Sequence, residues 1–207
     1  MGVDLGADHQ RFAAAGARLA GVDLTERAVA HTRQRLAASG LSSQLQTADA
    51  ENLPFADSSF DIVYSWGVLH HSPNTPKAID EVWRVLRPGG SARVMIYHTH
   101  SLAGYMLWIR YALLAGRSGR SLADIYARNL ESPGTKAYTV AQAQKLFARF
   151  AKVEIETVLT HGDLLTSAAG QRHRRLLLTN ARAVWPSCLI RTFLPGHGLF
   201  LLARATK

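Results

Sequence analysis

The sequence predicts an α/β protein with a doubly wound, mostly parallel sheet, an antiparallel last strand and inserted helices. Three observations lead to this prediction. Strand-like and helix-like patterns alternate from residue 18 to residue 98, as in parallel strands joined by crossover helices. Residues 60–65 (FDIVYS) form a continuous apolar run, the pattern of a strand buried on both faces. Beyond residue 98 the alternation gives way to apolar and basic helical stretches.

The first half of the chain supplies the expected elements in order. Thr25 is the expected N-cap of a helix, because its hydroxyl can accept from a free backbone N–H group. Ile79, Val82 and Leu86 recur at helical spacing, and the Pro-Gly-Gly sequence at 88–90 breaks that helix. The expected elements are a helix at 9–15, a strand at 18–23, a helix at 26–38, strands at 45–49 and 60–65, a helix at 76–87 and a strand at 91–97.

In the second half of the chain, the sequence predicts helical segments inserted into this core. The expected divisions are an α/β core at 1–98 that is incomplete at its N-terminus, an inserted helical lid at 99–135, a core helix and strand at 136–162, a basic helical insertion at 163–194 and a last core strand at 195–207. The apolar stretch at 102–115 is too short to span a membrane.

Charge is distributed unevenly along the chain. The net charge is +9, yet residues 1–98 carry nine Lys and Arg against ten Asp and Glu, and residues 99–207 carry fifteen against five. The densest basic run is 172–175. A basic half predicts an anionic partner, such as nucleic acid, an acidic membrane surface or an acidic substrate, and a solvated basic face is an equal alternative. The single cysteine, Cys188, excludes an internal disulfide and predicts a reduced, cytoplasmic setting.

Acidic side chains stand where predicted strands end. Asp23 and Asp49 each close a strand, and Asp23 follows Gly2 by 21 residues. This is close to the interval between a glycine turn and a ribose-binding acid in dinucleotide-binding folds, where glycine lets the backbone approach the ligand and the carboxylate accepts from two hydroxyl groups. The pattern therefore predicts a nucleoside site at the carboxyl ends of the strands.

Four motifs make the prediction specific: GVDLT at 21–25, ADAENLPF at 48–55, FDIVYSWGVLHH at 60–71 and LRPGG at 86–90. In this order and spacing they resemble the class I S-adenosylmethionine-dependent methyltransferases, in particular the small-molecule, type 11-like group that includes quinone-ring methylating enzymes. The resemblance covers residues 2–98. It implies S-adenosylmethionine as the cofactor and a small, apolar or amphipathic molecule as the methyl acceptor.

The resemblance also implies roles for individual residues on the cofactor side. Gly2 and Gly6 correspond to the outer glycines of the cofactor-binding turn. The other implied contacts are Asp23 with the ribose hydroxyls, Leu24 beside the adenine, Asp49 with the adenine amino group, Ala50 facing the ring through its amide, and Ser65 and Trp66 along the methionine part.

On the acceptor side, His70 and His71 lie where the substrate-facing loop begins. Either histidine is a candidate base if the acceptor is a hydroxyl, or a residue that positions the acceptor. Tyr105 and Trp108 are candidates for the wall of an acceptor pocket, with packing of their helix on the core as an equal alternative. No third ligand stands at a recognisable spacing from the histidine pairs, so the sequence predicts no metal site.

Two departures from the family pattern concern the start of the chain. The middle glycine of the turn is replaced by Asp4, whose side chain would crowd the cofactor and whose charge would repel the cofactor carboxylate. The first strand of the family's sheet would end near Met1, between the strands at 18–23 and 60–65. Its absence predicts an N-terminally shortened sequence and leaves two strand edges unpaired.

Three alternatives remain open. RNA or protein methylation would use the basic second half, although no separate RNA-binding module is recognisable, which argues against nucleic acid. A truncated, catalytically inactive remnant would explain Asp4 and the shortened start. Peripheral contact with an anionic membrane would use the basic and apolar second half.

Overall fold

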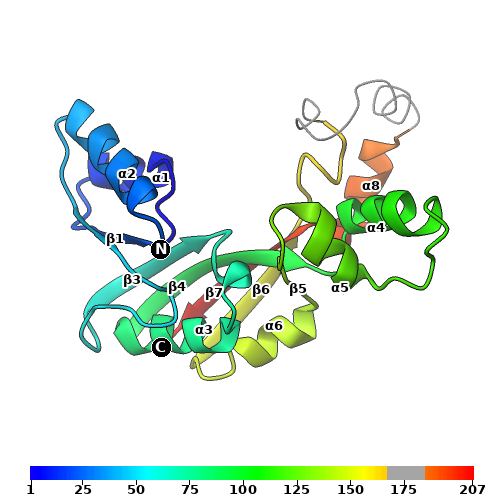
Figure 1. The fold of residues 1–207 in the computed structure, drawn as a ribbon. Helices are drawn as coiled ribbons and strands as arrows, with labels where there is room; N and C mark the ends of the chain where they lie inside the picture. Colours follow the sequence, from blue (N-terminus) through cyan, green and yellow to red (C-terminus); the bar gives the residue numbers. More distant parts are fainter. Residues whose placement is uncertain (167–184) are drawn as a thin grey trace. The chain divides into compact units, whose positions relative to one another are not determined.

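The computed structural model describes residues 1–166 and 185–207 (Figure 1). The chain forms two compact units. Unit 1 comprises Met1–Met95, Leu146–Glu154 and Arg204–Lys207, and unit 2 comprises Ile96–Lys145 and Ile155–Ala203. The predicted basic run at 172–175 and most of the predicted basic insertion at 163–194 lie outside the described residues.

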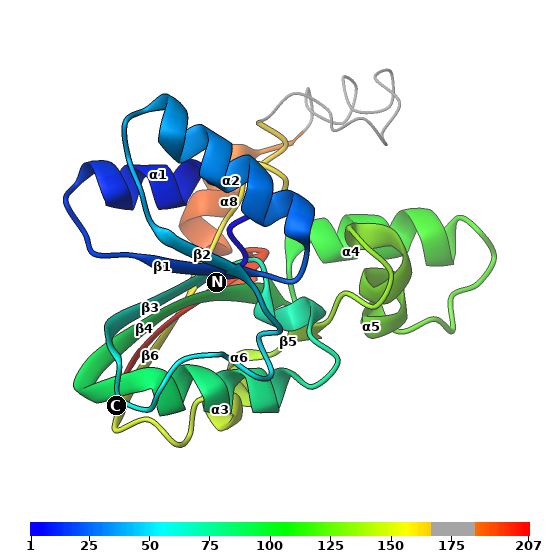
Figure 2. The same cartoon turned by 60° about the vertical axis from the view of Figure 1, so that its left-hand side comes forward.

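Unit 1 begins with the elements that the first half of the sequence predicts. They are α1 (Ala7–Ala14), β1 (Ala20–Asp23), α2 (Glu26–Ala38), β2 (Gln44–Thr47), β3 (Phe60–Trp66), the short 3₁₀ helix η1 (Leu69–His71), α3 (Thr75–Val85) and the first part of β4 (Leu86–His98). Helices α1 and α2 lie together beside β1 and β2 (Figure 2). Thr25 caps α2 as predicted, because its side chain accepts a hydrogen bond from the Ala28 N–H.

Helix α3 carries much of the core of unit 1. Ile79 and Val82 are at most 1% exposed, as their helical spacing predicts, and Val85 is 1% exposed as well. The helix ends at Val85, and β4 starts directly after it, earlier than the predicted strand at 91–97. Residues 87–90 therefore lie inside β4, where they form a bulge that shifts the register between β3 and β4.

The strands form two sheets. Strands β1 and β2 pair in parallel, and the second sheet has the order β3-β4-β7-β6, with β5 (Ala137–Tyr138) parallel to the end of β4. Strand β7 (Phe200–Thr206) begins next to the end of β4, where the His98 N–H donates to the Leu199 carbonyl at 2.8 Å. Its far end lies next to the start of β4, since the Lys207 N–H donates to Gly90 at 3.0 Å. The predicted antiparallel last strand is thus confirmed.

A gap separates β1 from β3. Among the described strands, β1 pairs with β2 alone and β3 with β4 alone, so the described residues place no strand between β1 and β3, as expected from the sequence. The prediction that β3 is buried on both faces is wrong, because Ile62 is 63% and Trp66 is 43% exposed. A strand with one unpaired edge lacks the neighbours that would cover it.

Unit 2 contains most of the remaining elements. They are α4 (Leu102–Trp108), the π-helical turn η2 (Ile109–Leu113), α5 (Leu122–Ile125), the π-helical turn η3 (Tyr126–Leu130), most of α6 (Val140–Leu146), the second part of β6 (Lys152–Val158), α8 (Ser187–Phe193), the 3₁₀ turn η4 (Pro195–His197) and most of β7. The apolar stretch at 102–115, within the predicted helical lid, forms α4 and η2. None of the described helices combines the length and apolar character that crossing a membrane requires.

A buried carboxylate ties unit 2 together. Asp163 is fully buried, and its oxygens accept hydrogen bonds from the backbone N–H groups of Ala103, Thr160 and Leu199 at 2.8–2.9 Å. Because these donors belong to three separate chain segments, the single side chain fixes the start of α4 and the start of β7.

Candidate functional site

The polar residues of the candidate site lie in unit 1, at the carboxyl ends of β1, β2 and β3. The turn at residues 2–6 is held at this edge because the nitrogen atoms of Met1 and Gly2 donate hydrogen bonds to the two strands that flank the gap. The Met1 amino group donates to the Tyr64 carbonyl at 2.7 Å, and the Gly2 N–H donates to the Val22 carbonyl at 2.8 Å.

Both predicted glycines of this turn are required by its geometry. Gly2 has φ +66°, and a Cβ atom there would lie 2.1 Å from Val68 Cγ2. Gly6 has φ +73°, and a Cβ atom there would lie 2.8 Å from the Thr32 side chain. At both positions a side chain would meet an unfavourable positive φ and a steric clash, so only glycine fits without strain. The turn is held from outside by Thr32 of α2, whose hydroxyl donates to the Asp4 carbonyl at 3.0 Å.

Asp4 occupies the same turn with φ +44°, a left-handed conformation that L-residues adopt at a cost. Its backbone N–H donates to Asp23 Oδ2 at 3.1 Å. The other oxygen of Asp23 accepts from the N–H and hydroxyl groups of Thr25 at 3.0 and 3.1 Å. Asp23 therefore joins the turn to the start of α2, and its oxygens retain lone pairs for further donors.

Asp49 and Ala50 follow β2 at the same edge. One carboxylate oxygen of Asp49 accepts from the Glu51 N–H at 2.9 Å, and the residue is exposed. Glu51 in turn accepts from the Ser72 hydroxyl and from the Asn74 N–H at 2.6 Å. The loop after β2 is thereby fastened to the loop after η1.

Ser65 and Trp66 lie at the end of β3, which extends one residue beyond the strand predicted at 60–65. Ser65 is fully buried, and its hydroxyl has no hydrogen-bond partner among residues 1–166 and 185–207. A buried hydroxyl without a partner is costly in a folded protein, so this atom is a candidate for a ligand contact. Trp66 and Leu24 are exposed at 43% and 72%, which leaves apolar surface beside the turn.

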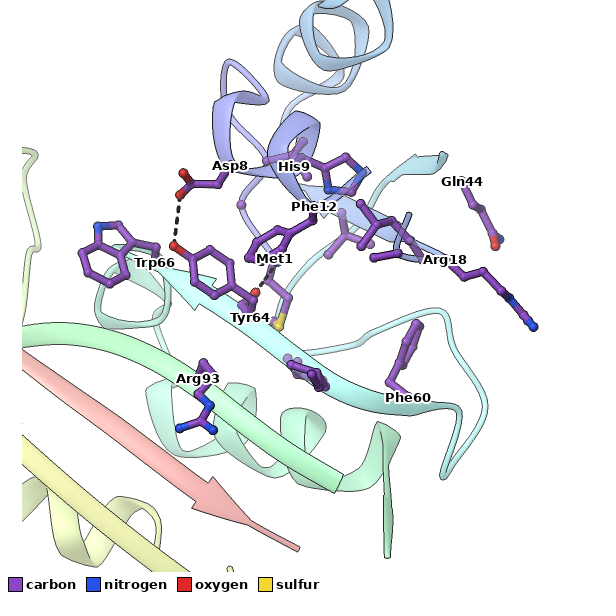
Figure 3. A pocket seen from close by; sticks show the side chains of 18 of the residues that line it. Met1, Asp8, His9, Phe12, Arg18, Gln44, Phe60, Tyr64, Trp66 and Arg93 are labelled. Carbon is purple, nitrogen blue, oxygen red and sulfur yellow. Dashed lines mark hydrogen bonds between the residues drawn. The ribbon is translucent and has the colours of Figure 1, made fainter. Parts of the chain in front are cut away.

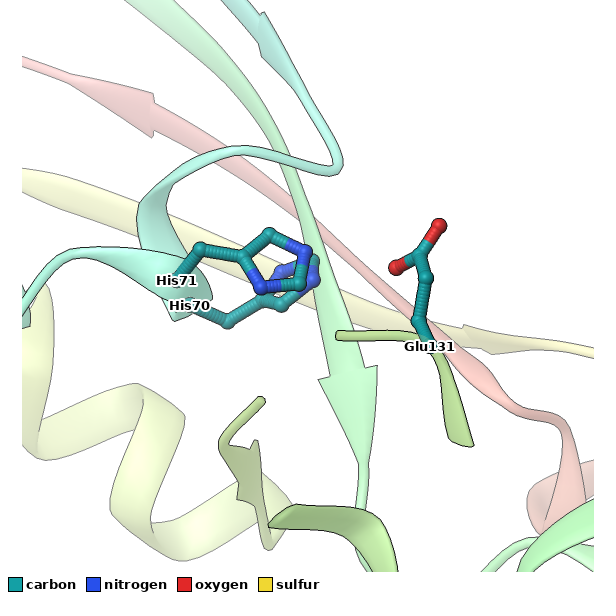
Figure 4. A group of neighbouring side chains, drawn as sticks. All are labelled: His70, His71 and Glu131. Carbon is teal, nitrogen blue, oxygen red and sulfur yellow. The ribbon is translucent and has the colours of Figure 1, made fainter. Parts of the chain in front are cut away.

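The two predicted histidines differ in exposure. His70 is fully buried, whereas His71 is partly exposed, and their rings lie 4.2 Å apart between centroids on η1 (Figure 4). Exposure makes His71 the better candidate for contact with an acceptor. Glu131, also drawn in Figure 4, accepts a hydrogen bond from the Tyr97 hydroxyl at 3.0 Å.

Tyr105 and Trp108 lie on α4 of unit 2, and both are partly buried. The Trp108 indole N–H donates to the Arg120 carbonyl at 2.7 Å, which fastens α4 to the loop before α5. The Tyr105 hydroxyl lies 3.4 Å from His100 Nδ1. Their assignment to an acceptor pocket stays a prediction.

A cavity of about 1130 Å³ opens in unit 1 along the gap between β1 and β3 (Figure 3). The Tyr64 hydroxyl donates to Asp8 at 3.0 Å across its upper part. Burial, followed by this hydrogen bond and the charge of Asp8, raises the pKa of Tyr64 to about 12. The phenol therefore stays protonated and keeps α1 attached to β3.

Sequence reasoning missed several residues that shape this edge. Thr32, Glu51 and Tyr64 form hydrogen bonds with partners that lie 21–56 positions away in the chain, so local periodicity could not indicate them. The one available signal was that Glu51 and Tyr64 fall within the motifs at 48–55 and 60–71.

Comparison with known proteins agrees with this geometry. Residues 1–94 match the family model described as "Methyltransferase domain", which confirms the predicted class I methyltransferase resemblance over this part of the chain. Over 92 residues the chain is 39% identical to an uncharacterised protein of Mycobacterium tuberculosis, with 44% of this chain and 34% of that protein covered. It is also 27% identical over 165 residues to a demethylmenaquinone methyltransferase of Desulfitobacterium hafniense, with 76% and 64% covered. The chain thus spans about a third of the mycobacterial relative.

Solved structures show the fold. A methyltransferase of Thermotoga maritima, described as a possible histamine N-methyltransferase, matches with a TM-score of 0.64 at 18% identity, covering 100% of this chain and 79% of that chain. The [4+2]-cyclase SpnF matches with a TM-score of 0.65 at 20% identity, covering 100% and 73%. Because one of these two proteins is named as a cyclase, the shared fold alone does not fix the reaction.

Proposed function

We propose that this protein binds S-adenosylmethionine at the carboxyl edge of β1, β2 and β3 and transfers its methyl group to a small, apolar or amphipathic acceptor. The main support is the hydrogen bond between the Asp4 N–H and Asp23, which brings the glycine turn and the strand-ending acid together. Relatives named as quinone and sterol methyltransferases supply the acceptor class.

The residues present fit this cofactor in several respects. Asp23 has oxygens available for two ribose hydroxyls, and Asp49 can accept from an adenine amino group through its second oxygen. The Ser65 hydroxyl offers a buried donor at the end of β3. The N-terminus of α1 follows Gly6 without a side-chain cap, so its N–H groups favour a carboxylate.

Two carboxylates of the protein oppose binding of the cofactor carboxylate at the N-terminus of α1. Asp4 lies in the turn, and Asp8 lies in the first turn of α1. Asp8 is turned towards Tyr64 by their hydrogen bond (Figure 3), which leaves Asp4 as the group that would repel the cofactor carboxylate. We therefore propose that this protein binds the cofactor more weakly than it would with glycine at position 4.

Bound S-adenosylmethionine supplies a methyl group activated by its sulfonium. This chain's residues would align that group with the acceptor, since alignment provides much of the rate acceleration in such transfers. His71, partly exposed on η1, would accept a proton when the acceptor is a hydroxyl. The apolar surfaces of Leu24 and Trp66 would flank the adenine and the methyl donor.

Isothermal titration of the folded protein with S-adenosylhomocysteine tests the cofactor half of the proposal. Binding that weakens at least about tenfold in Asp23→Ala, relative to an Asp57→Ala control on the surface of unit 1, supports it. No binding at high micromolar ligand by a folded sample would favour the inactive remnant instead. Transfer of labelled methyl to a demethylated quinone, compared with a sterol and an RNA, then tests the acceptor class.

A further inference from the structure

An exposed apolar surface lies at the end of the helix that α4 and η2 form in unit 2 (Figure 1). Ile109 is 45%, Leu113 is 50% and Leu114 is 77% exposed. The Leu114 N–H donates to the Ile109 carbonyl at 2.9 Å, which is the bond of a π-helical turn. Because such a turn holds one residue more than an α-helical turn, both leucines follow Ile109 on the same side of the helix. We call these three side chains the apolar tip.

Backbone hydrogen bonds fix the segment that carries the apolar tip. Gly116 ends the helix at φ +67°, and the N–H groups of Gly116 and Arg117 donate to helical carbonyls at 3.1 and 2.7 Å. These two bonds make a Schellman motif, which closes the helix end. At the base of the segment, the Trp108 indole N–H donates to the Arg120 carbonyl at 2.7 Å. The apolar tip is therefore presented by a closed turn that spans residues 109–120.

Three arginines fall within this same turn. They are Arg110, Arg117 and Arg120, and the first two are exposed. No Asp or Glu occurs in the sequence between Glu81 and Asp124, so the turn carries a local excess of positive charge. Residues 109–120 thus combine exposed apolar side chains with uncompensated basic charge along the sequence.

This combination fits the surface of an anionic lipid bilayer. Exposed leucine and isoleucine can enter the boundary between headgroups and acyl chains, while guanidinium groups meet the lipid phosphates. A nucleic-acid backbone offers phosphates to the arginines but leaves the apolar tip in water. In a symmetric dimer formed through this turn, each copy would face an equally basic surface, so charge opposes that contact.

We propose that residues 109–120 dock this protein on membranes that contain acidic phospholipids. The apolar tip enters the headgroup boundary, and Arg110 and Arg117 face the lipid phosphates. The contact is peripheral and reversible, since one turn buries far less apolar surface than a spanning helix does. The anionic partner considered for the basic second half is thereby narrowed to a membrane and to one turn of unit 2.

Vesicle flotation of the whole protein tests the proposal. Vesicles of phosphatidylcholine are compared with vesicles in which about 30% of the lipid is phosphatidylglycerol, and the partition coefficient is measured for each. Matched controls come from α8, which also exposes apolar side chains and an arginine. The variants are Leu113→Ser/Leu114→Ser and Arg117→Gln in the turn, with Leu189→Ser/Phe193→Ser and Arg191→Gln as their controls.

The unmodified protein should bind the anionic vesicles at least about tenfold more strongly than the neutral ones, and salt at about 1 M should weaken this binding through screening. The double serine variant of the apolar tip should lose at least about tenfold in partition coefficient. Arg117→Gln should lose about fivefold, which corresponds to about 1 kcal/mol for one arginine near the surface. Both α8 controls should change the partition coefficient by less than about twofold.

Three results would overturn the proposal. The first is no binding to anionic vesicles by the folded, unmodified protein. The second is an equal or greater loss in the α8 controls, which would remove the assignment to residues 109–120. The third is self-association or RNA binding that the variants of the turn abolish, without vesicle binding by the unmodified protein.

Two further features keep the outcome interpretable. All substituted side chains are exposed, so each variant should unfold at the same urea concentration as the unmodified protein, and a lost vesicle contact then does not reflect unfolding. Flotation needs no cofactor, so its result is independent of the proposed methyl transfer.

Discussion

The backbone N–H of Asp4 donates to the side chain of Asp23 across 3.1 Å, so the residue that breaks the family's glycine pattern also holds the turn against β1. This hydrogen bond uses the backbone of Asp4 and would survive a change of side chain. The Asp4 side chain itself adds a negative charge and a left-handed conformation at φ +44°. Backbone and side chain therefore have opposite consequences for a ligand at this turn.

Replacing Asp4 should strengthen cofactor binding. Asp4→Asn removes the charge and keeps a side chain that tolerates the left-handed region, so we expect S-adenosylhomocysteine to bind about fivefold more tightly. Asp4→Gly also removes the Cβ atom and the backbone strain, so its gain should be larger and accompanied by about 1 kcal/mol of added stability. Titration calorimetry and urea unfolding measure the two effects. Equal or weaker binding by both variants would show that the Asp4 charge does not oppose the ligand.

The variant Ser65→Ala should show whether the Ser65 hydroxyl contacts the ligand or stabilises the fold. The Ser65 hydroxyl is buried without a partner among the described residues, so its removal should leave the free energy of unfolding unchanged or raise it by up to about 1 kcal/mol. Cofactor affinity should fall at least about threefold, because a buried donor to the ligand is lost.

The matched control for this experiment is Ser101→Ala in unit 2. Ser101 is equally buried, but its hydroxyl lies 2.6 Å from the Tyr126 hydroxyl and accepts from the Gly104 N–H at 2.9 Å. Its loss should cost about 1–3 kcal/mol of unfolding free energy. If Ser65→Ala destabilises the protein as much as the control does, the hydroxyl has a structural partner and the ligand role is not supported.

Arg84→Lys should loosen the loop after β2. The Arg84 guanidinium donates to the carbonyls of Leu53 and Phe55 at 2.9 and 2.7 Å and pairs with Glu81 at 2.7 Å. A lysine cannot span this set, so we expect a loss of about 1–3 kcal/mol in urea unfolding. The control Arg87→Lys concerns an exposed ion pair with Asp61 and should cost less than about 1 kcal/mol. Equal losses in the two variants would contradict this assignment.

The sequence predicted the fold class and the elements of unit 1 because each follows from local pattern, such as the Thr25 cap and the spacing of Ile79 and Val82. The gap between β1 and β3 was expected from the resemblance to the family rather than from local pattern. The sequence misjudged the burial of Ile62, since burial depends on neighbours that only the tertiary structure supplies. The sequence also did not predict the hydrogen bond from the Asp4 N–H to Asp23, because this bond requires a left-handed residue in a turn.

His98 should make the stability of unit 2 depend on pH. It is 5% exposed, and its Nδ1 lies 3.1 Å from the Gly198 carbonyl, to which it donates. Burial is the main cause that lowers the pKa of His98. His100 and His197 lower it further, while the bond to Gly198 and the charge of Asp163 oppose the shift.

Because the pKa of His98 is lower in the folded state, the unfolded chain binds a proton first as the pH falls below about 6.5. The contribution of His98 to stability is therefore complete above about pH 6.5 and declines as the pH falls towards the lower, folded pKa. His98→Asn keeps an N–H donor but does not titrate, so its unfolding free energy should change less between pH 7.5 and 5.5 than that of the unmodified protein. Urea unfolding at both pH values measures the difference, and NMR titration of the His98 ring checks the pKa directly. Identical pH dependence in the two proteins would mean that His98 titrates alike in the folded and unfolded states.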